Sequence, residues 1–477
     1  MNMKKILFAF LITGAWGTTM AQGYQVSLQS NAGTGYAYLT YYAGGSLNVE
    51  DSAAVSNTGL AIFKGNKTLP PGIYSIVFPG KRLSADFLIG KAKKQAIQIV
   101  ADTAHLSQLK VSGSPEDILF RQYQQFVAKQ GQLLSAERMA YMNAKTATDS
   151  ALHEKKYITY NAELNRYRQN IVDQQPGSMM AILLKAMKEP PYPEKKPITR
   201  QDSIDNYNFY KAHYWDGISF MDDAVVRTPF FKPKLETYFR EVIPQSSDSI
   251  IKDLDYKLLL ARTAPEMYKF LLNWFTDEYI SPKYMGQDAV FVHLFNKYHS
   301  KGLTSWLNEK QMDAITRRAY MLMANLVGEK AANIELLDPA GKMQSLYNVE
   351  ADYTVVAFWD PNCGHCKEEM PRIDSLYKAQ WKNKNIKVFA VMTEYDTTAW
   401  KQYIADHHLD YWVHVYQPME MMVAERNSQQ PSFKQLYDVT QTPTLYLLDK
   451  EKRIMAKKLT PAQINELLLA KWNTAEK

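Results

Sequence analysis

The sequence predicts a multidomain protein with a small all-β N-terminal domain, an α-helical middle domain and a C-terminal α/β domain. The chain has 477 residues, which is too long for one ordinary hydrophobic core. Its 46% hydrophobic and 22% charged residues are typical of folded proteins. The pattern of apolar residues changes twice along the chain. The expected boundaries are 1–21 for a signal peptide, 22–112 for the β domain, 113–327 for the helical domain and 328–477 for the α/β domain.

The first residues have the pattern of an export signal. Lys4 and Lys5 give a positive start, residues 6–16 are largely apolar, and small residues flank Met20. This apolar run is shorter than the roughly 20 residues that a membrane span needs, and no cysteine near Met20 could carry a lipid. A buried N-terminal helix is the less favoured alternative. We expect an exported protein of the periplasm or cell envelope, without a lipid anchor or a transmembrane segment after signal removal.

The charge pattern argues against nucleic-acid binding. The net charge is +7, but basic residues alternate with acidic ones and form no long run. Proteins that bind nucleic acids concentrate Lys and Arg in a patch. We therefore expect no nucleic-acid partner.

The two upstream domains differ in their local patterns. Short strand-like runs at 36–42, 73–78 and 96–100, separated by Gly and Pro, indicate a small antiparallel sandwich. The helical domain then begins at Ser114, which precedes a proline suited to the first helical position. Apolar residues spaced as one helical face follow at 267–275. No cluster in the helical domain has the spacing of a metal or nucleophile site, so we interpret it as a scaffold.

The C-terminal domain alternates strands and helices in the order β-α-β-α-β-β-α. Its last helix follows a capping box at Thr460 with proline at the first helical position. Pro371 should bend the first helix, because its ring blocks one backbone hydrogen bond. The expected strands are 353–359, 386–392, 444–448 and 454–459, and the second helix is 398–408.

Cysteine usage points to redox chemistry. The chain has only two cysteines, Cys363 and Cys366, where a strand is expected to pass into a helix. A disulfide that closes so short a loop contributes little stability. The helix N-terminus should lower the pKa of Cys363, the attacking thiol, and a protonated His365 would add a second positive group. Cys366 would resolve the mixed disulfide.

Other interpretations of the two cysteines fit less well. A zinc site would need two further ligands, and the chain has no other cysteine. A structural disulfide has little entropic benefit, and a peroxidase would not require a second thiol at this spacing. We expect no metal and no cofactor apart from the redox-active Cys363–Cys366 disulfide itself.

The motifs FWDPNCGHCKEEMP at 358–371 and QTPT at 441–444, with the element order above, resemble the thioredoxin superfamily, most closely its exported TlpA/ResA/CcmG-like branch. The resemblance implies a thioredoxin-like fold, a cis-proline at Pro443 and strand-like pairing of substrate with Thr442. It also implies proton handling by Glu369, for which a solvated helix residue is the open alternative. An ordinary turn proline is the alternative for Pro443. Trp359, just before the motif, is a candidate substrate-binding residue.

Three departures from the family pattern affect what is carried over. Ala357 stands where many thioredoxins have a buried acid, and the segment between Tyr416 and Tyr437 looks longer than usual. The CGHC motif is similar to that of protein disulfide isomerases, which are more oxidising than the reductases of the TlpA branch. The candidate proton acceptors are then Glu369, Asp360, Glu394 and water.

The upstream runs at 51–65 and 111–126 resemble exported Bacteroidetes proteins in which a β and a helical domain precede a TlpA-like module. This upstream resemblance implies no known chemistry for the two domains. The resemblance of the C-terminal domain to the TlpA branch implies a reductase of exported protein disulfides, or of apocytochrome thiols in cytochrome c biogenesis, re-reduced by a membrane electron donor. An oxidase or isomerase is the alternative. A third hypothesis is a cell-envelope binding protein that uses the thioredoxin-like unit as a docking scaffold.

Overall fold

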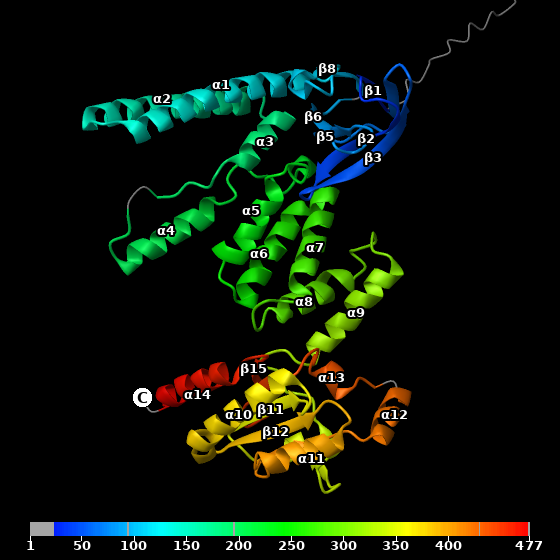
Figure 1. Cartoon of the computed structure of the whole chain (residues 1–477), viewed down its shortest axis with the longest axis vertical. Coiled ribbons are helices and arrows are strands. Elements are labelled where there is room, and N and C mark those ends of the chain that lie inside the picture. Colours follow the sequence, from blue (N-terminus) through cyan, green and yellow to red (C-terminus); the bar gives the residue numbers. More distant parts are fainter. Residues whose placement is uncertain (1–22, 93–94, 194–195, 429, 476–477) are drawn as a thin grey trace, which may run out of the picture. The chain divides into compact units, whose positions relative to one another are not determined.

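A computed structural model of the chain describes residues 23–92, 95–193, 196–428 and 430–475 (Figure 1). The expected signal peptide lies outside these ranges. Within them, no helix combines the length and the apolar character that crossing a membrane requires. The chain forms two compact units, Met1–Tyr238 with Thr263–Met267 and Phe239–Arg262 with Tyr268–Lys477. Their boundary falls inside the predicted helical domain, so the three-part division remains a prediction.

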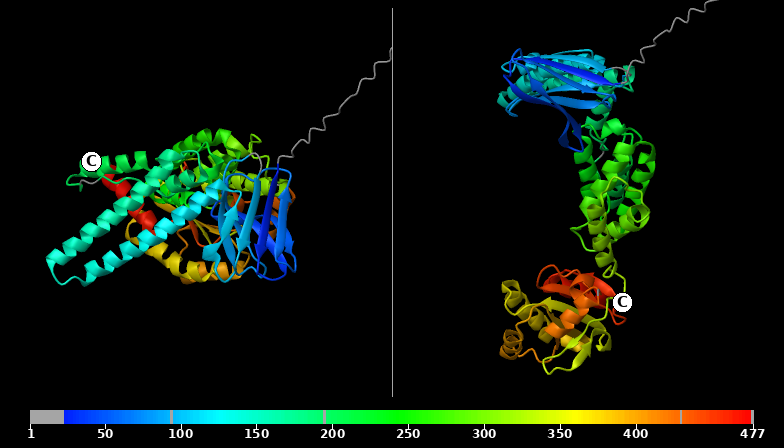
Figure 2. Two further views of the ribbon diagram at one scale, coloured as in Figure 1. Left: turned by 90° about the horizontal axis from the view of Figure 1, so that it is seen from above. Right: turned by 90° about the vertical axis from the view of Figure 1, so that its right-hand side faces the viewer.

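The β domain consists of two four-stranded sheets that enclose one apolar core (Figure 2). Strands β1 and β7 pair in parallel, so the expectation of a purely antiparallel sandwich was wrong. The reason is that β7 returns in the direction of β1 and inserts between β1 and β8. The first sheet contains β4 (Leu60–Gly65), β1 (Tyr24–Ser30), β7 (Gln95–Ala101) and β8 (Lys110–Ser112), and the second contains β3 (Ser46–Val55), β2 (Gly35–Ala43), β5 (Gly72–Val77) and β6 (Ser84–Ile89).

The first helix of this unit begins at the proline that the sequence predicted. Pro115 opens α1, but the Ser114 hydroxyl donates to the Leu88 carbonyl at 2.6 Å and does not cap the helix. Figures 1 and 2 show α1 and α2 side by side as a long hairpin. The helices are α1 (Pro115–Asn143), α2 (Ala147–Gln174), α3 (Met179–Met187), α4 (Arg200–His213) and α5 (Phe231–Thr237).

Arg227 joins the β domain of the first unit to the residues that start α7. Its guanidinium donates to both carboxylate oxygens of Glu266 at 2.9 Å and lies 4.5 Å from the centroid of the Tyr41 ring. The arginine is 4% exposed. A bidentate pair with a nearly buried arginine is among the stronger ionic contacts in proteins.

The helices of the second unit lead into the α/β domain. Met267, Leu271 and Phe275 are fully buried, which confirms the predicted apolar face of α7. This part of the chain contains α6 (Ser247–Leu260), α7 (Pro265–Tyr279), α8 (Asp288–Leu294) and α9 (Glu309–Met323).

The α/β domain has a mixed five-stranded sheet with helices on its faces, which is the predicted thioredoxin-like fold (Figure 1). Strand β11 is central, pairing in parallel with β12 and antiparallel with β14. The short strand β13 and helices α12 and α13 were not predicted, and the two helices lie within the segment between Tyr416 and Tyr437. The sheet order is β13 (Val413–Val415), β12 (Ile386–Met392), β11 (Tyr353–Trp359), β14 (Thr444–Leu448) and β15 (Ile454–Lys457).

Helix α10 (Gly364–Ala379) continues through Pro371, and α14 (Pro461–Ala475) starts at the predicted capping box. The hairpin of β9 (Glu335–Leu337) and β10 (Met343–Ser345) precedes the sheet. The remaining helices are α11 (Thr397–Asp406), α12 (Met419–Asn427) and α13 (Phe433–Leu436).

Replacing Arg227 with alanine should destabilise the first unit by about 2 kcal/mol, because Glu266 loses its bidentate partner while remaining partly exposed. Strand amides that exchange by unfolding of this unit should then exchange about thirtyfold faster. Hydrogen exchange measured on β2 and β5 checks this. Lys232→Ala is the matched control, because its contact with Glu236 at 3.8 Å lies at the surface and should change exchange less than about twofold. Equal effects of the two changes would contradict the assignment.

Candidate active site

The two cysteines lie at the junction between the end of β11 and the start of α10. The Trp359 carbonyl at the end of β11 accepts hydrogen bonds from the Thr393 backbone at 2.9 Å and hydroxyl at 3.1 Å. A tight turn follows, in which the Cys363 amide donates to the Asp360 carbonyl at 3.2 Å. Cys363 is therefore the N-cap residue of α10, as the sequence predicted. Thr393 was missed because it sits on the neighbouring strand, where sequence spacing gives no signal.

Cys363 is the accessible thiol. Its Sγ lies 3.4 Å from the Thr442 carbonyl oxygen. Partial burial raises the pKa of Cys363, but hydrogen bonds from the Thr442 side chain and from the backbone of Cys366 and His365 outweigh it and leave the pKa lowered. The free N–H groups of a helix N-terminus act in this way on a thiolate.

Cys366 has the opposite environment. It is 1% exposed and packs in the apolar core formed by β11, α10 and α11. Burial raises its pKa to about 12, although the Asp360 amide donates to its Sγ at 3.5 Å. Both cysteines are free thiols. One helical turn thus holds one thiol suited to ionise and one suited to remain protonated.

The Thr442–Pro443 segment lies directly against Cys363. The peptide bond between these two residues is cis, as the resemblance implied, and both residues are partly exposed. The Thr444 hydroxyl, at the start of β14, donates to the Gln441 carbonyl at 2.6 Å and closes this loop. The loop therefore presents backbone groups at the surface beside the reactive sulfur.

The three other expected site residues differ in their accessibility. His365 is exposed, and its backbone N–H takes part in stabilising the Cys363 thiolate. Glu369 lies one turn after Cys366, with one carboxylate oxygen 2.5 Å from Arg372 and the other buried without a hydrogen-bond partner among the described residues. Trp359 is completely buried, so its indole is not available to a substrate at the surface; it packs 5.1 Å from the Tyr403 ring beneath the site.

The candidate proton acceptors are not equally placed. Ala357 occupies the position at which many thioredoxins have a buried acid. It pairs with Ala390 on β12, so neither side chain at this position can accept a proton. Glu394 lies 3.6 Å from Lys434 and is half-exposed. Asp360 accepts from the Asn362 amide at 3.0 Å. Only Glu369, of the three acids considered, has a buried carboxylate oxygen without a hydrogen-bond partner within the described ranges.

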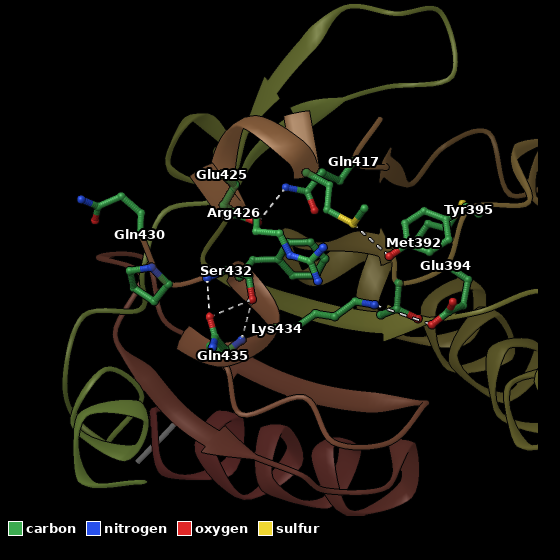
Figure 3. Close-up of a pocket in the computed structure, with 14 residues that line it drawn as sticks. Met392, Glu394, Tyr395, Gln417, Glu425, Arg426, Gln430, Ser432, Lys434 and Gln435 are labelled. Carbon is green, nitrogen blue, oxygen red and sulfur yellow. Dashed lines mark hydrogen bonds and ion pairs between the residues drawn. The ribbon is translucent and has the colours of Figure 1, made fainter. Parts of the chain in front are cut away.

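A pocket of about 650 Å³ lies at the carboxyl end of β12 (Figure 3). Thr393, which holds the Trp359 carbonyl, is part of its wall, and the segment from Gln417 to Gln435 forms most of the rest. The Tyr395 hydroxyl contacts the Met422 sulfur at 3.0 Å, and the Gln417 side-chain amide donates to Glu425 at 3.0 Å. Figure 3 shows Gln417 and Glu425 turned toward each other. Residues of α12 and α13 thus line a recess that contains neither cysteine.

Across residues 23–475, with the gaps given above, no three His, Cys, Asp or Glu side chains are grouped so that they could hold an ion.

Comparison with known proteins identifies relatives of the C-terminal region. A family model described as the AhpC/TSA family matches residues 327–457. The thiol-disulfide oxidoreductase ResA of a Bacillus cereus strain is 24% identical over 131 residues, which are 28% of this chain and 68% of ResA.

Solved structures from Bacteroidetes are also similar. A domain of a possible thiol-disulfide isomerase from Cytophaga hutchinsonii is 32% identical, with a TM-score of 0.27, over 32% of this chain and 96% of that chain. A thioredoxin-like protein from Bacteroides caccae is 21% identical, with a TM-score of 0.45, over 60% of this chain and 99% of that chain. With the family match and the strand–cysteine–helix geometry, the C-terminal region belongs to the thioredoxin superfamily, in its TlpA/ResA-like branch, and is a thiol–disulfide oxidoreductase.

Proposed function

We propose that this protein is a periplasmic thiol–disulfide oxidoreductase that reduces disulfides of exported proteins through its CGHC motif. The contrast between the two thiols carries the proposal. Cys363 is accessible with a lowered pKa, and Cys366 is buried with a pKa raised to about 12. A nucleophile must ionise first, and a resolving thiol must remain protonated until the mixed disulfide has formed.

The reaction proceeds in two exchanges. The Cys363 thiolate attacks one sulfur of the substrate disulfide, forms a mixed disulfide and releases the other sulfur as a thiolate, which takes up a proton. Cys366 then loses its proton and attacks the Cys363 sulfur, which releases the second substrate thiol. Two electrons pass to the substrate, and the protein keeps the Cys363–Cys366 disulfide. A membrane electron donor would supply two electrons to restore the dithiol.

The surrounding residues have separate roles in this scheme. Thr442 offers its backbone to a substrate in extended conformation, and Pro443 shapes the loop beside Cys363. Glu369 is the proposed acceptor for the Cys366 proton, because its unpartnered oxygen, among the described residues, lies on the same helix, one turn further on. His365 contributes its backbone N–H to the thiolate.

The export pattern in residues 1–21 supports a location in the periplasm or cell envelope. Outside the cytoplasm, the substrates would be disulfides of exported proteins, including apocytochrome disulfides, whose reduction yields the two thiols. The lowered pKa of Cys363 favours the thiolate and so makes a protein more oxidising. This observation supports an oxidase or isomerase as the second candidate.

Replacing Cys363 with serine should reduce exchange to the uncatalysed rate, because the nucleophile is lost. Replacing Cys366 with serine should instead trap a mixed disulfide with the substrate, since resolution fails. Reduction of insulin disulfides followed by non-reducing electrophoresis tests both. If Cys363→Ser retains the wild-type rate, the scaffold hypothesis replaces the redox one.

At pH 7, iodoacetamide should label Cys363 at least about tenfold faster than Cys366, because only the thiolate reacts. The Cys363 rate should persist to lower pH than for an ordinary thiol, in keeping with its lowered pKa. Mass spectrometry of the labelled dithiol form gives both rates. Thr442→Val, which removes the hydroxyl and keeps the carbonyl, should move the pH midpoint upward. An unchanged midpoint would show that the Thr442 side chain does not stabilise the Cys363 thiolate.

The reduction potential decides the direction of electron flow. The whole chain contains only these two cysteines, so equilibration with glutathione reports a single couple, followed by fluorescence of the buried Trp359 region. A potential near about −270 mV or lower supports the reductase, and one near about −180 mV or higher supports an oxidase or isomerase. A chain without a reversible dithiol–disulfide transition would overturn both.

A further inference from the structure

Asp438 is an unusual residue at the base of the loop that carries Thr442 and Pro443. Its side chain is 1% exposed, and its backbone φ is +46°, in the left-handed region. That conformation is costly for most residues and costs glycine nothing. Aspartate adopts this region more readily than most residues, because its short polar side chain can hydrogen-bond locally. Its carboxylate is nevertheless buried at this position, so it needs ionic or hydrogen-bond partners.

Both oxygens of the Asp438 carboxylate are bound by cations. Arg318 donates through Nη1 to Oδ1 at 2.5 Å, and Lys458 donates through Nζ to Oδ2 at 2.5 Å. Burial raises the pKa of Asp438, but the hydrogen bonds from these two cations outweigh it and keep the pKa lowered. The carboxylate is thus charged and buried, and each of its oxygens accepts a hydrogen bond from a cation.

The cluster brackets the loop on both sides. Asp438 lies four residues before Thr442. Lys458 follows β15, and its backbone N–H donates to the Leu445 carbonyl at 2.7 Å, two residues after Pro443. The Tyr446 hydroxyl, further along β14, donates to the carbonyl of Tyr437 at 2.5 Å. The loop that supports Cys363 is therefore fixed at its entry and at its exit.

Arg318 comes from α9, a helix that precedes the α/β domain in the sequence. Its Nε donates to the Ile280 carbonyl at 2.9 Å, which orients the guanidinium. Asn325, two turns further along, donates to the Leu436 carbonyl at 3.0 Å. Figure 1 shows α9 reaching the α13 region that contains Leu436. The helical segment thus holds residues 436–438 at two points.

A second buried cluster keeps α9 and α8 in place against β15. Lys457 donates to Asp288 and to the Asn325 carbonyl and side-chain oxygens, the last two at 2.6 and 2.5 Å. Lys457 is 6% and Asp288 2% exposed. Because an ion pair buried this deeply tolerates little displacement, Arg318 reaches Asp438 from a fixed base.

We propose that Arg318 is a positioning residue of the exchange site, which holds the Thr442–Pro443 loop through Asp438 and Lys458 and thereby increases affinity for protein disulfides. This rests on the proposed function of the site. A substrate that pairs with the Thr442 backbone binds more tightly when the loop is already ordered, since less entropy is lost on binding. The helical segment then takes part in substrate recognition without touching the substrate.

The test compares two disulfides on the full mature chain: insulin, whose backbone can pair with Thr442, and hydroxyethyl disulfide, which has no peptide groups. Arg318→Gln should raise KM for insulin about fivefold and change kcat by less than about twofold, with hydroxyethyl disulfide reduction unchanged. Arg317→Gln is the matched control. This neighbour on α9 is 69% exposed and pairs only with Asp313, at 2.7 Å, among the contacts described, so both substrates should react as in the wild type.

Asp438→Gly provides a variant that should fold, because glycine suits the left-handed backbone. It should raise KM for insulin at least as much as Arg318→Gln does, because it breaks the contacts with both Arg318 and Lys458. The double variant should show no increase beyond that of Asp438→Gly, since the Arg318 contact is already lost in that variant. Unchanged KM in both single variants, additive effects, or equal loss with both substrates would each overturn the inference. If the wild-type chain reduces neither disulfide, the proposed function fails, and the inference fails with it.

Discussion

The exchange site depends on one constraint: a buried strand passes directly into a helix. The first backbone N–H groups of this helix have no partner within the helix and can donate to the Cys363 sulfur. At Trp359 the chain leaves the sheet, and four residues later Cys363 caps α10. The same geometry that exposes Cys363 to the helix N-terminus carries Cys366 one turn inward, into the core. Hydrogen-bond donors stabilise the Cys363 thiolate, whereas desolvation disfavours a Cys366 thiolate. The pKa of Cys363 is therefore lowered and that of Cys366 is raised.

The sheet keeps this geometry rigid. Apolar cores cover both faces, and β11 in the centre is buried along nearly its whole length. Thr393 on β12 binds the carbonyl of Trp359, while the loop before β14 supplies Thr442. The reactive sulfur is therefore positioned by three segments that are remote in sequence.

The α9 contacts suggest why an exchange domain is attached to a long helical segment. Arg318 and Asn325 bind the chain between α13 and the Thr442 loop, and the buried Lys457–Asp288 pair fixes the base from which they act. Charged groups at such depth contribute little net stability, because desolvation offsets their attraction. In our proposal they hold one arrangement of the chain, which includes the loop beside Cys363. The pocket lined by residues of α12 and α13 is a second feature of this domain's surface.

The sequence alone predicted the fold class and the position of the two-cysteine motif on a strand-to-helix turn, because both follow from local patterns: apolar runs, a helix start and a two-residue spacing. It also led to the roles proposed for the two cysteines. Helix α7 and the capping box before α14 were predictable for the same reason. The parallel pairing of β1 with β7, the short strand β13, the support from Thr393, the burial of Trp359 and the Arg318–Asp438 contact were not. Each of these is decided by residues far apart in the chain, whose meeting depends on packing that no local period encodes.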